Sequence, residues 1–217
     1  CFDRTMHHED VDCTGAEINF IRMRGCAVPF GYGKSQWGVL EKIQKFPALS
    51  QLEKIEFARE IDETRIDDRL SDSGDIKFVK GFMVNRFSGE PDAVRFLSDK
   101  SVKIPQSVWM PKIVWRDVSR ESQTRRLKAT LLPSGYIAGN SLGVLFSTES
   151  DTEILLFILA VLNSFVFEFQ AKPHLVTNHV PAGIIRELRV PALCDQQLKK
   201  RIVEETKKLI GLHKEED

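Results

Sequence analysis

The sequence predicts a mixed α/β (α+β) fold, in which a twisted sheet packs on a buried core helix and an amphipathic helix follows at the C-terminal end. Three observations support this prediction. Short alternating or β-branched stretches recur between residues 76 and 146, apolar residues fill residues 154–162 without interruption, and residues 195–213 carry apolar side chains on one face only. The 217 residues suffice to bury a core, in one large domain or two small ones.

The N-terminal third predicts a loop, a helix and a strand. Residues 1–33 mix short alternating stretches with the turn-rich PFGYG, which is typical of a short strand and a loop. Ser35 is a suitable cap for a helix that ends before Pro47. The stretch LEKIEFAREI, residues 52–61, fits either a second helix or a strand, and we favour a strand that follows a short helix.

The middle of the chain has the clearest strand patterns. After the acidic turn SDSGD, Ile76 and Phe78 fall on one face of a strand with Lys77 on the other, and Gly81 marks a bulge or a turn. Three further strand-like stretches follow, and we expect them to share one sheet: residues 113–118, 127–133 and 136–146.

The C-terminal third predicts two helices of different character. A helix that begins at Thr148 or Ser150 and continues to Gln170 is apolar on nearly all sides, so we expect it to be the buried core helix. Its longest apolar run has nine residues, well short of the about 20 that cross a bilayer, and we expect no membrane anchor. A short strand at residues 189–193 and a polar helix with one apolar face complete the chain.

Charge is balanced overall but segregated along the chain. Lys+Arg and Asp+Glu both number 31, which excludes a uniformly basic nucleic-acid binder. Residues 112–128 hold six basic and two acidic side chains, whereas residues 53–75 hold nine acidic and four basic ones. We expect the acidic stretch to form a solvated face.

Motifs that would indicate catalysis are weak. The GYGKS stretch lacks the glycine that a Walker phosphate loop needs five residues before its second glycine, because that position is Val28, so a plain turn is favoured. A metal-dependent nuclease would be compatible with four residues but is not specified by them: Glu56, Glu60, Asp62 and Lys77. No Ser/His/Asp arrangement can be assembled, and we expect no catalytic residue in this chain.

The cysteines also argue against a metal site or a disulfide framework. The four cysteines form no CxxC pair, which favours a reduced cytoplasmic protein. Metal ligands could in principle come from His7, His8, Cys13 and Cys26, but only the two histidines are adjacent. We therefore expect no bound metal.

The basic segment begins as a strand and continues as a polar loop rich in arginine. Such a loop can present guanidinium groups to DNA phosphates or to guanine edges: Arg116, Arg120, Arg125 and Arg126. Surface ion pairs of Arg116 with Asp117 or Glu121 are equally compatible with these residues. A second loop places His174 and His179 around Asn178, where they could read a base edge or bond the backbone, the latter being slightly favoured.

Three stretches taken in order resemble a known family: residues 112–145, with VWRD, RR and GNSLGVL, residues 159–170, with LNS, and residues 175–191, which end in VP. They resemble the C-terminal target-recognition domain, the Taq-like specificity domain, of adenine-specific DNA methyltransferases of type II restriction–modification systems. The LNS and VP features are shared with the specificity subunits of type I systems. The resemblance covers roughly residues 37–193.

The resemblance implies how the chain is organised. Residues 1–36 would connect to a catalytic domain, residues 37–193 would recognise DNA, and residues 194–217 would form a C-terminal helix. In the family, an N-terminal methyltransferase domain of the same polypeptide binds S-adenosylmethionine and closes on the flipped adenine with an Asx-Pro-Pro-aromatic motif. This chain has no such motif and begins with Cys1, so we expect it to be a piece of a longer protein, without a cofactor or activity of its own.

The expected function is therefore recognition of a specific double-stranded DNA sequence for an adenine methyltransferase, which could also be fused to an endonuclease. Phosphate contacts are expected from Arg116, Arg120, Arg125, Arg126 and Lys128. Base readout is expected from Gln123, Asn178 and His179. Among the arginines we favour the last three for phosphate, because Arg116 can pair with Asp117 and shape the loop. Alternatives are a protein-interaction or scaffold module, a type I-like specificity subunit and an embedded nuclease.

Overall fold

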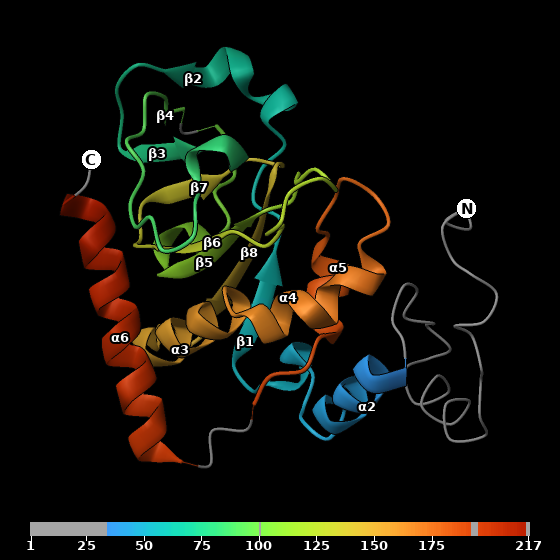
Figure 1. Cartoon of the computed structure of the whole chain (residues 1–217). Coiled ribbons are helices and arrows are strands. Elements are labelled where there is room, and N and C mark those ends of the chain that lie inside the picture. The colour runs from blue at the N-terminus through green and yellow to red at the C-terminus, as the bar shows by residue number, and fades with distance from the viewer. Residues whose placement is uncertain (1–33, 100, 192–194, 216–217) are drawn as a thin grey trace.

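The computed structural model describes residues 34–99, 101–191 and 195–215 (Figure 1). The strand and loop expected for residues 1–33 lie outside the described residues, and so do the candidate metal ligands of that segment. Strands and helices follow one another in mixed order along the described chain, which confirms the mixed α+β fold class.

The first sheet is antiparallel and has four strands in the order β1, β8, β5, β6. The strands are β1 (Ile55–Ala58), β5 (Lys112–Arg116), β6 (Ala129–Leu132) and β8 (Leu142–Ser147). The strand expected within residues 52–61 is thus confirmed, and the 3-10 turn η2 (Leu49–Gln51) precedes it. In β5 every residue before Arg116 is buried, because both faces of this central strand are covered.

The second sheet has four strands in the order β2, β4, β3, β7, of which β3 and β7 run parallel. The strands are β2 (Leu70–Ser71), β3 (Ile76–Val79), β4 (Phe96–Leu97) and β7 (Tyr136–Ala138). Apolar side chains from both sheets form one cluster, in which Val79 and Ala138 of the second sheet pack with Val114 and Val144 of the first. The two sheets therefore share a core.

The expectation that the strands after residue 113 share one sheet was wrong. The stretch 136–146 is two strands, and β7 joins the second sheet while β8 joins the first. The chain turns between them, where Gly139 N donates to Val79 O and Leu142 N donates to Gly139 O. Periodicity identifies strand-forming residues but not their partners, so this division had no local signal.

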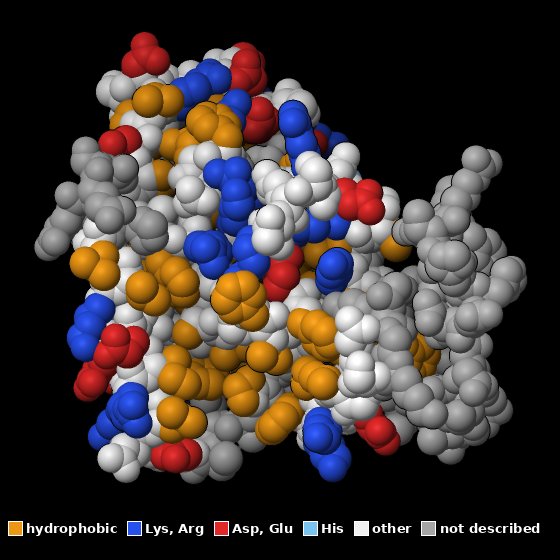
Figure 2. All heavy atoms as spheres, viewed as in Figure 1, with side chains coloured by type: hydrophobic (Ala, Val, Ile, Leu, Met, Phe, Trp, Pro, Cys, Tyr) orange, Lys and Arg blue, Asp and Glu red, His pale blue; other side chains and the backbone are white. Residues whose placement is uncertain are grey.

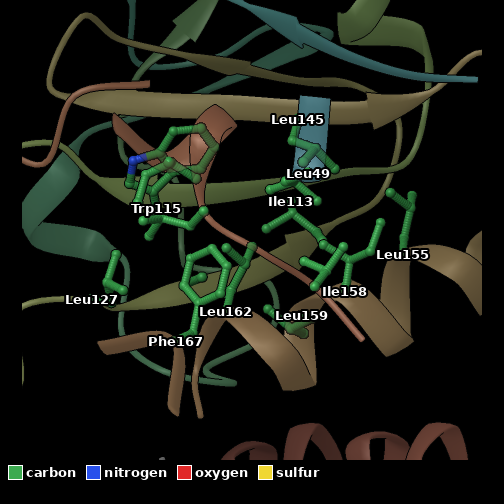
Figure 3. Close-up of a cluster of buried hydrophobic side chains, with 14 of the residues drawn as sticks. Leu49, Ile113, Trp115, Leu127, Leu145, Leu155, Ile158, Leu159, Leu162 and Phe167 are labelled. Atoms are coloured by element: carbon green, nitrogen blue, oxygen red, sulfur yellow. The ribbon is translucent and has the colours of Figure 1, made fainter. Parts of the chain in front are cut away.

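The expected core helix is divided into α3 (Thr152–Leu162) and α4 (Phe165–Ala171). The segment Phe165–His174, which contains α4, is bent by 66° from α3. Asp151 caps α3, since its carboxylate accepts a hydrogen bond from Ile154 N at 3.1 Å. Ser164 caps α4 in the same way, with Phe167 N donating to its Oγ at 3.1 Å. The single-helix expectation was wrong because the serine after Asn163 begins a new helix. Figure 3 shows the α3 leucines and Phe167 of α4 directed toward Trp115 and Ile113 of β5.

The other helices lie around this core: α2 (Lys34–Ile43), α5 (Ala182–Glu187) and α6 (Gln196–Glu215). Helix α6 packs on α3 and buries Val203 and Thr206, but Leu198 and Leu209 on its predicted apolar face are largely exposed. The strand expected at residues 189–193 is reduced to one bridge between Arg189 and Ala48 within the described residues. The remaining 3-10 turns are η3 (Glu63–Arg65), η4 (Asp67–Arg69), η5 (Gly81–Met83), η6 (Gln106–Trp109) and η7 (Lys172–His174).

Taken singly, none of the described helices is long and apolar enough to cross a bilayer, and the pair formed by α3 with Phe165–His174 meets these two criteria only as a bent unit.

Asn163 ties the bend between α3 and α4 to the first sheet. Its Nδ2 donates to Ala129 O at 3.0 Å and its Oδ1 accepts from Ala129 N at 3.1 Å, so the side chain continues the ladder at the start of β6. The residue is 5% exposed. The asparagine of the LNS motif is thus explained by backbone pairing at a buried site.

We expect Asn163→Ala to lower the free energy of unfolding by about 2 kcal/mol, because Ala129 N loses its acceptor inside the protein and Ala129 O keeps only the bond from Phe87 N. Urea denaturation followed by circular dichroism measures the change. Asn163→Asp is the matched variant, since it keeps the acceptor but loses the donor and buries a charge, and it should be at least as unstable. A loss below about 0.5 kcal/mol for Asn163→Ala would contradict this role.

Candidate nucleic-acid interface

Two loops that are distant in the sequence lie side by side. The β5–β6 loop, residues 117–128, follows the central strand of the first sheet, and the α5-entry loop, residues 175–181, leads from η7 into α5 (Figure 1). Val118 and His179 form an antiparallel bridge between them. Ser119 N donates to Asn178 O at 2.8 Å, and Val180 N donates to Asp117 O at 2.6 Å. These backbone bonds fix the two loops as one surface.

Two of the side chains expected to read bases, Asn178 and His179, also connect the two loops. Asn178 Oδ1 accepts from Glu121 N at 3.2 Å, and His179 Nδ1 lies 3.0 Å from Asp117 Oδ2. Gln123 Oε1 accepts from Ser119 Oγ at 2.9 Å, which closes a turn inside the β5–β6 loop. In these contacts Asn178 and Gln123 use only their amide oxygens, and His179 uses one ring nitrogen. The amide nitrogens of Asn178 and Gln123 make no hydrogen bond within the described residues and remain free to donate to a ligand.

Arg120 stands at the rim of an open hollow of about 540 Å³ that it lines together with Glu121, Ser122 and Asn178. Its side chain is exposed, and no carboxylate or hydrogen-bond acceptor among the described residues engages its guanidinium group. The hollow is wide open to solvent, so it suits a macromolecular surface or an extruded base better than a small molecule that must be enclosed.

Arg126 is 5% exposed and points into the protein, so the expectation that it contacts phosphate does not fit the structure. Its guanidinium group donates to four backbone carbonyls. Nη1 bonds Leu175 O at 2.6 Å, and Nη2 bonds the carbonyls of Ser119, Thr177 and His179. Arg126 therefore clamps the α5-entry loop onto the β5–β6 loop. Burial lowers its pKa, and Glu168 and Glu121 oppose that effect.

Arg125 is directed to the other side of the same backbone and contacts α4. Its Nη2 donates to Asn163 O at 2.5 Å, its Nε lies 3.5 Å from Glu168 Oε2, and its guanidinium stacks on the Phe165 ring at 4.3 Å. Its side chain is only 13% exposed. Phe165 beneath it is 77% exposed, so this stacked pair is a feature of the surface.

Glu168, which lies on α4, contacts both Arg125 and Arg126. Its two carboxylate oxygens accept hydrogen bonds from Arg126 N at 2.9 Å and Leu127 N at 3.0 Å. Sequence reasoning missed this residue, because a single acid inside an apolar helix gives no indication of what it pairs with.

Arg116 does not pair with Asp117, whose carboxylate is engaged by His179. Its guanidinium instead donates to Val84 O at 2.5 Å and Phe82 O at 2.9 Å, which joins the end of β5 to η5. Lys128, at the other root of the β5–β6 loop, is half-buried and has no ion pair within the described residues. Burial lowers its pKa, and the charges of Arg116 and Arg86 lower it further.

Basic side chains gather at the centre of the face shown in Figure 2, with hydrophobic side chains above and below them. Elsewhere, the residues considered for a nuclease do not form a metal site. Glu60 is buried against Lys112, and Lys77 Nζ donates to Tyr136 Oη at 3.0 Å. No cluster of three or more His, Cys, Asp or Glu side chains suited to a metal ion occurs in the described part of the chain.

Comparisons with known proteins give structural matches only. No protein-family model matches the sequence, and no curated protein matches it. A solved structure of the type IIG restriction endonuclease BpuSI matches with a TM-score of 0.53 at 14% identity, over 80% of this chain and 28% of that one. This likeness shows a shared fold.

Two further matches come from type I systems. A structure of a type I R-M system has a TM-score of 0.45 at 13% identity, over 91% of this chain and 49% of that one. The HsdS subunit from Thermoanaerobacter tengcongensis has a TM-score of 0.47 at 13% identity, over 91% and 48%. The chain thus spans less than half the length of each of these three proteins.

Proposed function

We propose that this chain is a target-recognition domain of a restriction–modification protein, which selects a sequence on duplex DNA. The observation that carries the proposal is the convergence of the β5–β6 loop and the α5-entry loop into one surface, where Arg120, Asn178 and His179 are exposed together. The fold that the chain shares with part of a type IIG restriction endonuclease supports the same assignment.

The roles differ among the residues of this surface. Arg120 is the best placed for a phosphate, because its guanidinium is exposed and unpaired within the described residues. The free amide nitrogens of Gln123 and Asn178 suit base edges, where an amide can bond adenine through N6 and N7. Arg125 and Lys128 add positive charge at the edge of the surface, whereas Arg126 and Arg116 hold its loops in position.

A finer version of the proposal concerns the catalytic partner. The domain would position a target adenine for methyl transfer by an S-adenosylmethionine-binding domain of the same polypeptide, and contacts along the duplex would help to offset the few kcal/mol needed to extrude the base. A type I-like specificity subunit would use the same two loops, with its catalytic subunits on separate chains. Whether the same gene also encodes a methyltransferase domain distinguishes the two arrangements.

Binding to duplex DNA is expected to weaken steeply with salt, because each phosphate contact releases condensed counterions. Fluorescence anisotropy with a labelled pool of random duplexes measures this between about 25 and 200 mM salt. Arg120→Gln should reduce the slope of log K against log salt by about 1, and Lys200→Gln on the distant α6 should leave it unchanged. No duplex binding at the lowest salt concentration would overturn the proposal in favour of a protein-interaction module.

Base readout is tested after the preferred sequence has been selected from a random duplex pool. Asn178→Asp keeps the oxygen that accepts from Glu121 N but removes the free amide donor. We expect this variant to keep its fold and to lose about 1–3 kcal/mol of discrimination between the selected duplex and single-base changes. Unaltered discrimination in both Asn178→Asp and Gln123→Ala would remove the amides from base readout.

A further inference from the structure

The turn η5 presents an exposed aromatic ring on a backbone that is held from two sides. Arg116 donates to the carbonyls of Phe82 and Val84, and Gly81 N donates to Ser141 Oγ at 2.9 Å. Gly81 is buried, and a Cβ at this position would meet Ser141 O at 2.9 Å, so the turn is seated closely on the chain beneath it. The Phe82 side chain is nevertheless 73% exposed. Single exposed apolar side chains are common on protein surfaces, so Phe82 indicates a contact only together with the charges beside it.

Three cations lie together beside this turn. The segment that follows η5 runs next to β6, where Phe87 N donates to Ala129 O at 3.0 Å. This pairing places Arg86 near Lys128, whose pKa is lowered mainly by burial and further by the charges of Arg116 and Arg86. Neither Arg86 nor Lys128 forms an ion pair with a described carboxylate. Like charges held together without an anion destabilise one another, and an anionic ligand would relieve this repulsion.

The place of this cluster in the fold relates it to the candidate interface. Arg116 ends β5 and Lys128 precedes β6, and Arg116 N donates to Lys128 O at 3.1 Å. The two cations therefore stand at the two roots of the β5–β6 loop, whose tip carries Arg120. A ligand that follows the loop toward its base would meet the cluster and η5 in succession.

We propose that η5 and the segment 84–89 form a second contact with the same nucleic acid, in which Arg86 and Lys128 hold a backbone phosphate and Phe82 packs on the adjoining sugar or base. The inference rests on the proposed function, because its occupant is the duplex held by the two loops. A nucleic-acid strand offers both an anion and a flat apolar face at short spacing, which matches an unpaired cation cluster beside a ring. An acidic polypeptide would match the cations only.

The test uses the 217-residue chain and a labelled random duplex pool, with three variants that separate the effect of the charge from that of the ring. Arg86→Gln should weaken binding about tenfold at low salt and reduce the salt slope by about 1. Arg86→Lys should restore the slope, because the charge returns. Phe82→Ala should weaken binding by about five- to thirtyfold with an unchanged salt slope, since it removes packing and no charge. Lys200→Gln serves again as the neutral control, and thermal melting verifies that each variant is folded.

The outcomes separate this inference from the proposed function. If Arg120→Gln weakens duplex binding while Arg86→Gln and Phe82→Ala bind as the unaltered chain does, the second contact is refuted and the recognition surface stands. If the unaltered chain binds no duplex, both fail. If polyglutamate binds more tightly than duplex and this binding is lost in Arg86→Gln, the cluster serves an acidic protein and the nucleic-acid inference is overturned.

Discussion

Replacement of Arg126 by alanine is expected to lower the free energy of unfolding by about 3 kcal/mol and to free the α5-entry loop from the β5–β6 loop. The side chain is 5% exposed, and it donates to carbonyls of Ser119, Leu175, Thr177 and His179. Alanine leaves these carbonyls without their shared donor and leaves Arg125 as the remaining cation beside Glu168. The loss therefore exceeds that of a surface arginine.

Two measurements test the role of Arg126. Urea denaturation gives the change in stability, and hydrogen exchange of the amides in residues 175–181 reports on local opening. Arg126→Lys is the matched variant, because it retains the charge but cannot reach four carbonyls with a single ammonium, and it should recover less than half of the loss. Arg120→Ala, six residues earlier on the exposed rim, should change stability little. Unaltered exchange in Arg126→Ala would show that the loops do not depend on this clamp.

Arg125 and Arg126 are neighbours in the sequence but have different surroundings, and the sequence could not predict which of them is buried. The two side chains point to opposite sides of the chain, so one guanidinium lies on Phe165 and the other enters the protein. Both positions are arginine, so the residue type does not distinguish them. Which one turns inward depends on Glu168 and on the α5-entry loop, both more than 40 residues away.

The elements themselves were easier to predict than their arrangement. The burial of Ile113, Val114 and Trp115 follows from their apolar run, and the helix over residues 195–213 follows from its one-sided pattern, as α6 confirms. The division into two sheets was not predictable, because the Gly139 turn that separates β7 from β8 looks like any other glycine turn. Nothing in the residue pattern indicated that the β5–β6 loop and the α5-entry loop lie side by side.

The acidic stretch, expected to be a solvated face, has one member that is buried. Glu60 is 8% exposed and Lys112 is fully buried, and their side chains meet at 2.6 Å. Lys112 Nζ also donates to Tyr136 O at 2.5 Å, and Glu60 Oε2 accepts from Ala138 N at 2.6 Å. Because Lys112 belongs to β5 and the other two partners to β7, this ion pair joins the first sheet to the second.

Lys112→Met is therefore expected to lower the free energy of unfolding by about 3–5 kcal/mol, because it leaves the Glu60 carboxylate buried without a counter-charge. Burial lowers the pKa of the Lys112 ammonium, and Glu60 opposes that effect, so the pair is held at a cost in desolvation. The chain tolerates this cost since Ser107 Oγ donates to Glu60 Oε1 at 2.6 Å and Ala138 N occupies the other oxygen, which leaves the carboxylate fully bonded.

A double variant separates the ion pair from the packing around it. Glu60→Gln together with Lys112→Met removes both charges and retains an amide oxygen for Ala138 N, so its loss should be about 1–2 kcal/mol, smaller than that of Lys112→Met alone. Lys54→Met serves as the control, because its ion pair with Glu149 is exposed and should contribute little. Urea denaturation of the unaltered chain, the two single variants and the double variant measures the coupling between Glu60 and Lys112. If the double variant is as unstable as the sum of its single changes, the two side chains act independently and the sheets are held together by their shared apolar cluster instead.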